Sequence, residues 1–124
     1  MLYVTNGNEQ EDFRAFIEHA IGVLSTEDYT TFLSLFDSSR LSEQDLILAL
    51  KYLDETRPVL KVDDPALVKK GCPDVCLLPY NDASGYCMGY DLTTNGVEND
   101  LTIQVEFLKE ADGYRVILED LHTL

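Results

Sequence analysis

Apolar residues recur every three or four positions through the first 57 residues, a pattern typical of helices that bury one face. One helix is predicted over 8–24 and a second over 25–36. A third begins at Ser42 and ends by Thr56, because Pro58 disfavours helical backbone in the residue before it. The predicted buried faces consist of Phe13, Phe16, Ile17, Ala20, Ile21 and Leu24, then Tyr29, Phe32, Leu33 and Phe36, then Leu46, Ile47, Leu50 and Leu53.

Each predicted helix begins with residues that cap free backbone N–H groups. Asn8 and Glu11 form a variant of the capping box, Ser25–Asp28 supplies a hydroxyl followed by acids, and Ser42–Asp45 opens the third helix. Acidic side chains in these first turns also complement the helix dipole. These signals place the three helix starts.

After Pro58 the pattern changes to short segments that favour strands, separated by turn residues. Strict apolar–polar alternation over 101–107 is the clearest strand signal, typical of an antiparallel sheet with one buried face. Residues 110–113 are expected to form a turn in which Gly113 can take a positive φ at little cost, while 66–74 is ambiguous. Strands are predicted at 59–62, 75–78, 86–92, 101–107 and 114–121, with a loop at 81–85.

Helices followed by an antiparallel sheet predict an α+β fold in which the helices cover one sheet face. The sequence contains neither an internal repeat nor a linker long enough to divide it, so residues 1–124 are predicted to form a single domain. A hydrophobic content of 45%, with twelve Phe and Tyr residues, favours a folded core over disorder.

The formal net charge of −14 indicates which partners the protein can bind, and does not bear on its fold. Residues 1–57 carry eleven acids and four bases, and 58–124 carry twelve and five, so each part contributes −7. A negative field on all sides repels nucleic acids and anionic membranes. Two interpretations remain open: acidity that maintains solubility, or a surface suited to a basic protein.

The N-terminal residues and the cysteines bear on location and metal binding. The first residues have no basic stretch followed by an apolar one, and three cysteines are an odd number, which together predict a cytoplasmic protein without disulfides. Cys72, Cys76 and Cys87, with His122 as a fourth ligand, lack the paired spacing of structural zinc sites. Neither a metal nor a cofactor is predicted.

Two stretches near the C-terminus carry a resemblance to a known family. Residues 99–107 contain "DLT" and residues 111–122 contain "YRV" and "DLH", and 40–45 (RLSEQD) resembles the same proteins more weakly. The chain resembles small bacterial NTF2-like proteins, a cystatin-like cone family that includes immunity proteins of polymorphic-toxin systems. The resemblance implies three N-terminal helices packed on a curved antiparallel sheet. It also implies several functions, since isomerases, dehydratases and binding modules share the fold.

In that family the cone encloses a pocket between the helices and the concave face of the sheet. The residues expected to line such a pocket are Tyr29, Glu106, Tyr114, Asp120 and His122. Asp120 and His122 lie two positions apart on a strand and so project to the same side, as an acid/base pair requires. The alternative is a solvated strand end.

A second group of candidates suits protein binding. Tyr80, Tyr86 and Tyr90, bordered by Asp74, Asp82 and Asp91, form an aromatic hairpin of the kind found at interfaces. The alternative is that these tyrosines fill the core. Further acids are expected in loops, as an exposed rim that steers a basic partner: Asp63, Asp64, Glu98 and Asp100.

These features lead to one main hypothesis and two alternatives. The main one is an acidic binding protein of immunity type, a monomer or homodimer, which neutralises a basic, nuclease-like bacterial toxin by covering its cationic site. The first alternative is an NTF2-like isomerase or dehydratase that moves a proton on a small apolar molecule. The second is a homodimeric scaffold.

Overall fold

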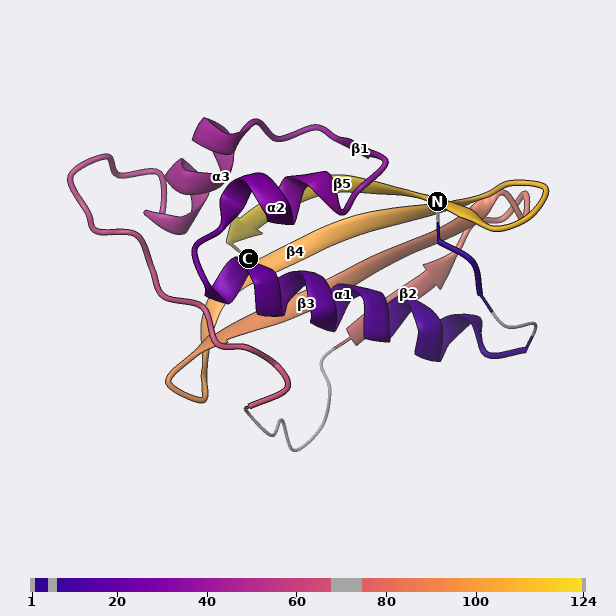
Figure 1. The fold of residues 1–124 in the computed structure, drawn as a ribbon, viewed down its shortest axis with the longest axis horizontal. Helices are drawn as coiled ribbons and strands as arrows, with labels where there is room; N and C mark the ends of the chain where they lie inside the picture. The colour runs from indigo at the N-terminus through magenta and orange to yellow at the C-terminus, as the bar shows by residue number, and fades with distance from the viewer. Residues whose placement is uncertain (1, 5–6, 68–74, 124) are drawn as a thin grey trace.

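The three predicted helices are present in the computed structural model, which describes residues 2–4, 7–67 and 75–123 (Figure 1). They are α1 (Glu9–Ser25), α2 (Tyr29–Ser34) and α3 (Glu43–Leu50). Ser42–Asp45 opens α3 as predicted, and there Ser42 and Asp45 form a capping box with both N–H···O distances at 3.1 Å. Asp28 caps α2 by accepting the Thr31 N–H. The predicted box on α1 is wrong, because the Asn8 side chain makes no capping hydrogen bond.

The third helix ends earlier than predicted, at Leu50. Tyr52 and Leu53 have φ values of +54° and +60°, in the left-handed region that costs an L-residue about 1–2 kcal/mol. The chain therefore leaves the helix axis there. Leu53, expected on the buried face, is 76% exposed.

The strands of the described residues form one five-stranded sheet, in the spatial order β1-β5-β4-β3-β2, and β1 precedes α3 in the chain. The strands are β1 (Ser38–Ser39), β2 (Val75–Pro79), β3 (Gly85–Thr94), β4 (Val97–Lys109) and β5 (Tyr114–Thr123). The strands predicted at 75–78, 86–92, 101–107 and 114–121 are confirmed as β2 to β5, all paired antiparallel.

Two predictions about the sheet are wrong. Residues 59–62 do not form a strand: the Leu60 N–H donates to the Leu50 carbonyl and the Asp63 N–H to the Thr93 carbonyl, so this segment only bridges α3 and the sheet. Conversely, β1 lies where only a break between helices was expected. It pairs parallel with β5, so the sheet is mixed.

All three helices lie on one side of the sheet (Figure 1), and the core forms between them. The Phe13 ring of α1 stacks on Phe107 of β4 with centroids 4.1 Å apart. Alternate residues of β4 face this core, and burying each such side chain contributes about 1.5–3 kcal/mol. These are Leu101, Ile103, Val105 and Phe107, none more than 1% exposed.

Gly113 is needed for a close approach, and its φ is not positive. Leu2 pairs with Tyr114, and a β-carbon on Gly113 would lie 2.6 Å from the Leu2 carbonyl oxygen. The N-terminal residues therefore pass directly over the last turn.

Gly85→Ala is expected to destabilise the fold, with Gly89→Ala as the matched control on the same strand. A β-carbon at Gly85, where φ is +157°, would clash with the Phe107 carbonyl oxygen, whereas at Gly89 the nearest atom is Thr102 Cγ2 at 3.6 Å. Chemical denaturation should show a loss of about 2–4 kcal/mol for Gly85→Ala and less than about 1 kcal/mol for Gly89→Ala. Equal losses would contradict this account of Gly85.

Candidate functional site

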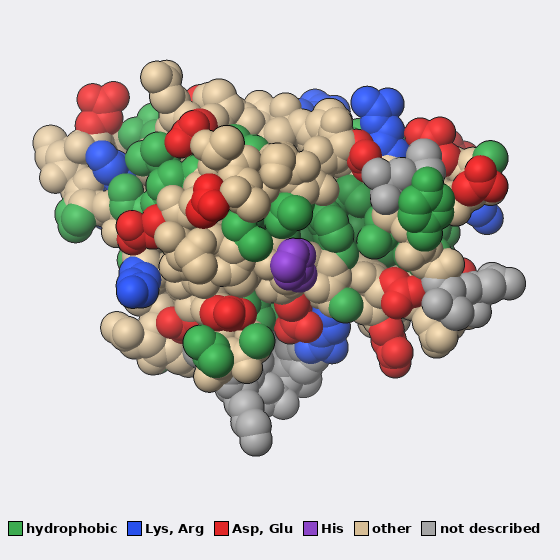
Figure 2. Space-filling view, viewed as in Figure 1, with side chains coloured by type: hydrophobic (Ala, Val, Ile, Leu, Met, Phe, Trp, Pro, Cys, Tyr) green, Lys and Arg blue, Asp and Glu red, His purple; other side chains and the backbone are tan. Residues whose placement is uncertain are grey.

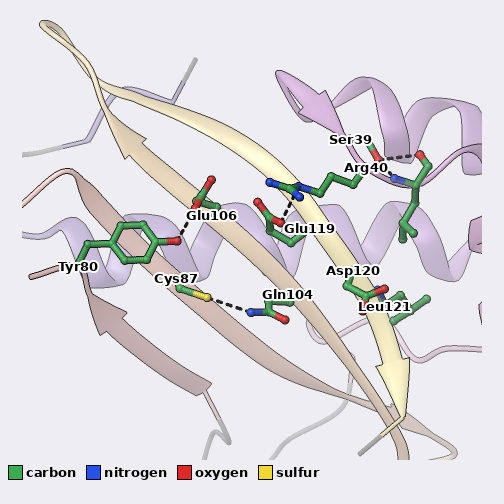
Figure 3. Close-up of polar contacts among 10 residues, drawn as sticks. Ser39, Arg40, Tyr80, Cys87, Gln104, Glu106, Glu119, Asp120 and Leu121 are labelled. Atoms are coloured by element: carbon green, nitrogen blue, oxygen red, sulfur yellow. Dashed lines mark hydrogen bonds and ion pairs between the residues drawn. The ribbon is translucent and has the colours of Figure 1, made fainter.

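The sheet face turned away from the helices is lined mainly by polar side chains, and we call it the outer face. On β4, Gln104 and Glu106 alternate with core residues and so project to this side. The register places Cys87 of β3 beside Glu106, and Asp120 of β5 beside Gln104. Figure 3 views this face with the helices behind the strands.

A one-residue bulge in β5 adds an extra acid to the outer face. Val105 pairs with Leu118 and Gln104 with Asp120, which leaves Glu119 without a partner residue on β4. Leu118 and Leu121 both point into the core. The two residues between them, Glu119 and Asp120, therefore both project outward, as bulges permit.

Two polar contacts connect this cluster to the surrounding elements (Figure 3). The Tyr80 hydroxyl donates a short hydrogen bond to Glu106 Oε2. Burial and this carboxylate together raise the pKa of the Tyr80 hydroxyl, which stays protonated. From the other side, Arg40 Nε lies 2.8 Å from Glu119 Oε2. The outer face thus already holds one guanidinium.

Glu119 is the unusual acid of this cluster. Its side chain is 18% exposed, and its Oε1 atom is buried without a hydrogen-bond donor. Burial raises the pKa of Glu119, the charge of Glu106 raises it further, and Arg40 only partly offsets them. Glu106 and Glu119 therefore form a pair of neighbouring carboxyl groups, in which the neutral form of Glu119 is favoured.

Other side chains extend the outer face toward the end of β5. Gln104 Nε2 donates to Cys87 Sγ at 3.2 Å, and Thr102 Oγ1 donates to Asp91 Oδ1 at 2.7 Å. A shallow hollow of about 190 Å³ is lined by Leu78, Cys87, Gly89, Thr102, Gln104 and His122. The surface here is open, and most of the lining of the hollow is apolar.

The three tyrosines predicted to form a binding hairpin are divided between the two faces of the sheet. Tyr90 is 2% exposed and donates to Glu18 of α1 at 2.9 Å, and Tyr86 packs against Phe13 with centroids 5.3 Å apart. Both follow the alternative interpretation, in which tyrosines fill the core. Only Tyr80 reaches the outer face.

The acids predicted as an exposed rim are in part structural. Asp63 accepts hydrogen bonds from Thr93 Oγ1 and from the N–H groups of Asn95 and Gly96, and so holds the β3–β4 turn. Burial raises the pKa of Asp63, but these bonds outweigh it and the net shift is downward. Asp64 accepts the Ala66 N–H.

The remaining acids of that group occupy different positions. Glu98 and Asp100 are exposed but belong to β4 and not to a loop, which corrects the prediction. Asp82 is exposed in the β2–β3 turn, where it accepts the Ser84 N–H. Asp74 lies outside the described residues. The rim is therefore scattered, and Figure 2 shows acids dispersed over the helix-covered side too.

The five residues predicted to line one pocket do not converge. Tyr114 faces the core, where its ring meets Phe13 edge-on at 4.9 Å, and Tyr29 is half-buried on α2. Glu106 lies on the opposite face of the sheet. The space between α1 and the sheet is occupied by the stacked rings of Phe13 and Phe107. Successive side chains of a strand point to opposite faces, so Glu106 and Phe107 of β4 cannot line the same pocket.

Asp120 and His122 do lie together, as predicted, with His122 Nδ1 3.3 Å from Asp120 Oδ2. They line a cavity of about 240 Å³ at the end of β5, beside the turn after α3. The side chains of Cys72 and Cys76 lie outside the described part of the chain, within which no three metal-ligating side chains cluster.

Sequence reasoning missed Glu119 and Arg40. The pair Glu119-Asp120 interrupts the alternation of β5 between Leu118 and Leu121, and two consecutive polar residues there are a signal of a bulge. Arg40 gave no such signal, because its position depends on the pairing of β1 with β5.

The comparisons with known proteins define the family. The model of a domain of unknown function, DUF7668, matches residues 21–124. The chain belongs to the DUF7668 family. No curated protein and no solved structure matches the chain. The DUF7668 match includes Arg40, Tyr80, Glu106, Glu119 and Asp120, so the outer-face cluster lies within the family domain. Within the described residues, none of its helices has the length and apolar character needed to cross a membrane.

Glu119→Gln is expected to stabilise the DUF7668 domain at neutral pH. Because folding raises the pKa of Glu119, the native state keeps a proton that the unfolded chain loses. Stability therefore falls as pH rises from about 4.5, the ordinary value for glutamate, through the native pKa.

The variant lacks this titration. Its gain over the parent protein should grow with pH to on the order of 1 kcal/mol, since losing the contact with the exposed Arg40 costs little. Denaturation at pH 4 to 8 measures the gain, with Glu110→Gln in the exposed β4–β5 turn as the control. A gain that does not change with pH would contradict the raised pKa of Glu119.

Proposed function

We propose that this DUF7668 protein is an acidic binding protein of immunity type, which inhibits a basic, nuclease-like toxin by covering its cationic site. The observation that carries the proposal is the Arg40–Glu119 contact. Arg40 remains 70% exposed while its Nε atom lies 2.8 Å from Glu119. A surface that holds one guanidinium beside two carboxyl groups suits a partner rich in arginine and lysine.

Charge supports the same class of partner over a longer range. A net charge of −14 attracts a basic protein from a distance and accelerates association. A nuclease must bind phosphate, so its active site has positive potential that such a protein complements. The field accounts for the association rate, and the outer face supplies the specific contacts.

The architecture is compatible with an NTF2-like cone, which we propose as the finer fold class. Three helices precede the four main strands and lie on one side of the sheet. Because this fold serves enzymes and binding modules alike, the assignment by itself does not favour either. The face that carries the polar cluster is the one without helices, and an open face suits a macromolecular partner.

The experiment that tests the function is co-expression with the product of the adjacent gene. The two proteins should co-purify, the complex should block the partner's nuclease activity, and affinity should fall at least tenfold between 50 and 300 mM salt. An adjacent product that does not bind, or binding that is insensitive to salt, would refute the proposal.

The double variant Glu106→Gln/Glu119→Gln should weaken this complex by at least tenfold, mainly through faster dissociation. Its matched control is Glu110→Gln/Asp112→Asn in the exposed turn, which removes the same two charges away from the cluster. The control should slow association slightly and leave dissociation unchanged. Surface plasmon resonance separates the two rates. Identical effects of both variants would mean that only the overall negative charge, and not the outer face, contributes to binding.

A further inference from the structure

β5 has a free edge next to the cavity of about 240 Å³, and we call this cavity the edge groove. β1 pairs with β5 only at Ile117 and Leu118, and Arg40 donates its N–H to the Leu118 carbonyl before the chain turns to α3. Beyond Leu118, no described strand pairs with this edge. The edge groove is lined by Ala49, Tyr52, Leu53, Leu101, Asp120, Leu121 and His122.

The Leu121 N–H reveals how this edge is arranged. Val116 and Leu118 direct their carbonyls toward β1, accepting from Asp37 and Arg40. The bulge inserts one residue. The next backbone N–H that points to the free edge of β5 therefore belongs to Leu121. Its N–H donates to the side chain of the preceding residue, Asp120 Oδ1, at 2.9 Å (Figure 3). A carboxylate thus occupies the place where an added strand would present a carbonyl.

The opposite wall of the edge groove is held by an unusual turn. Tyr52 and Leu53 are both left-handed, and the Tyr52 hydroxyl donates to the Asn99 carbonyl at 2.6 Å. This turn holds Leu53, with most of its side chain exposed, at the mouth of the groove. Together with Ala49, Leu101 and Leu121 it forms an apolar hollow, smaller than the roughly 300–1,000 Å³ of typical small-molecule sites.

We propose that the edge groove binds an extended, basic segment of the partner, which adds to β5 as a further strand. The partner's main-chain carbonyl takes the Leu121 N–H, an apolar side chain enters the hollow, and a lysine or arginine pairs with the released Asp120 carboxylate. Specificity in strand addition arises from alternate side chains in this way. The inference rests on the proposed function and names the element of the partner that makes contact.

The charges around the edge groove favour a basic segment over a second copy of this chain. The bulge sets Glu119 beside Asp120, and both lie at the free edge. The cationic groups near it include Arg40, which pairs with Glu119, and Arg57, which lies over the Tyr52 ring and pairs with Asp54. A second copy would bring another net charge of −14 to the same edge and be repelled, whereas a basic segment neutralises the acids there.

The experiment is a titration of the ¹⁵N-labelled full chain, followed by NMR. The probe is a capped heptapeptide of alternating lysine and valine at low salt. One comparator has alternate peptide nitrogens methylated, and another replaces lysine with glutamate. The amides of Leu121, Ala49 and Leu53 should shift in a saturable way, and both comparators should bind at least tenfold more weakly.

Two variants locate the bound segment. Leu53→Asn, a residue that tolerates left-handed backbone, should lower affinity about three- to tenfold without changing the fold. Leu78→Asn, at a 59% exposed position on the outer face, should have no effect.

The outcomes separate this inference from the proposed function. Amide shifts confined to the outer face, with loss of binding in Leu78→Asn, would refute the edge groove as the binding site. They would not affect the proposed function. Equal binding of the methylated peptide, or no shift at Leu121, would overturn strand addition. Shifts at Leu121 that grow with protein concentration in the absence of peptide would identify a second copy as the occupant. Failure of the adjacent gene product to bind would refute the proposed function independently.

Discussion

The packing of α1 against one face of the sheet decides which side of this DUF7668 domain is available for function. Phe13 stacks on Phe107, and neighbouring apolar side chains close the same layer. Because successive side chains of a strand point to opposite faces, this packing leaves the intervening residues on the other side. Glu106 lies on the outer face for the same reason that Phe107 lies in the core.

The bulge in β5 modifies this arrangement at one place. A regular strand would direct one side chain to the outer face between two buried leucines, but here Glu119 and Asp120 both project to that face between Leu118 and Leu121. The additional acid meets Glu106 and Arg40 on the outer face, while its neighbour closes the free edge of the strand. One inserted residue thus creates both the carboxyl pair and the chemistry of the edge groove.

The electrostatics of the domain act at two ranges. The overall charge is dispersed, and part of it is structural: Asp63 holds a turn, and Asp28 and Asp45 cap helices. These acids contribute to the field but are already bonded. The carboxyl pair differs, because burial and mutual repulsion make it costly to ionise both groups, and a cation that approaches them reduces that cost. Long-range attraction and short-range recognition therefore involve different residues.

The sequence by itself determined the local structure of this protein. Alternation predicted β4, and the Ser42–Asp45 signal predicted the start of α3, because these patterns depend on neighbours within one strand or one turn. The tertiary structure alone decided which residues meet. It packed Tyr86 against the core and buried Tyr90, separated Tyr114 from Glu106, exposed Leu53 and placed Arg40 on Glu119. Those outcomes depend on the face that α1 covers, on the bulge and on the pairing of β1 with β5, which are contacts between segments far apart in the chain.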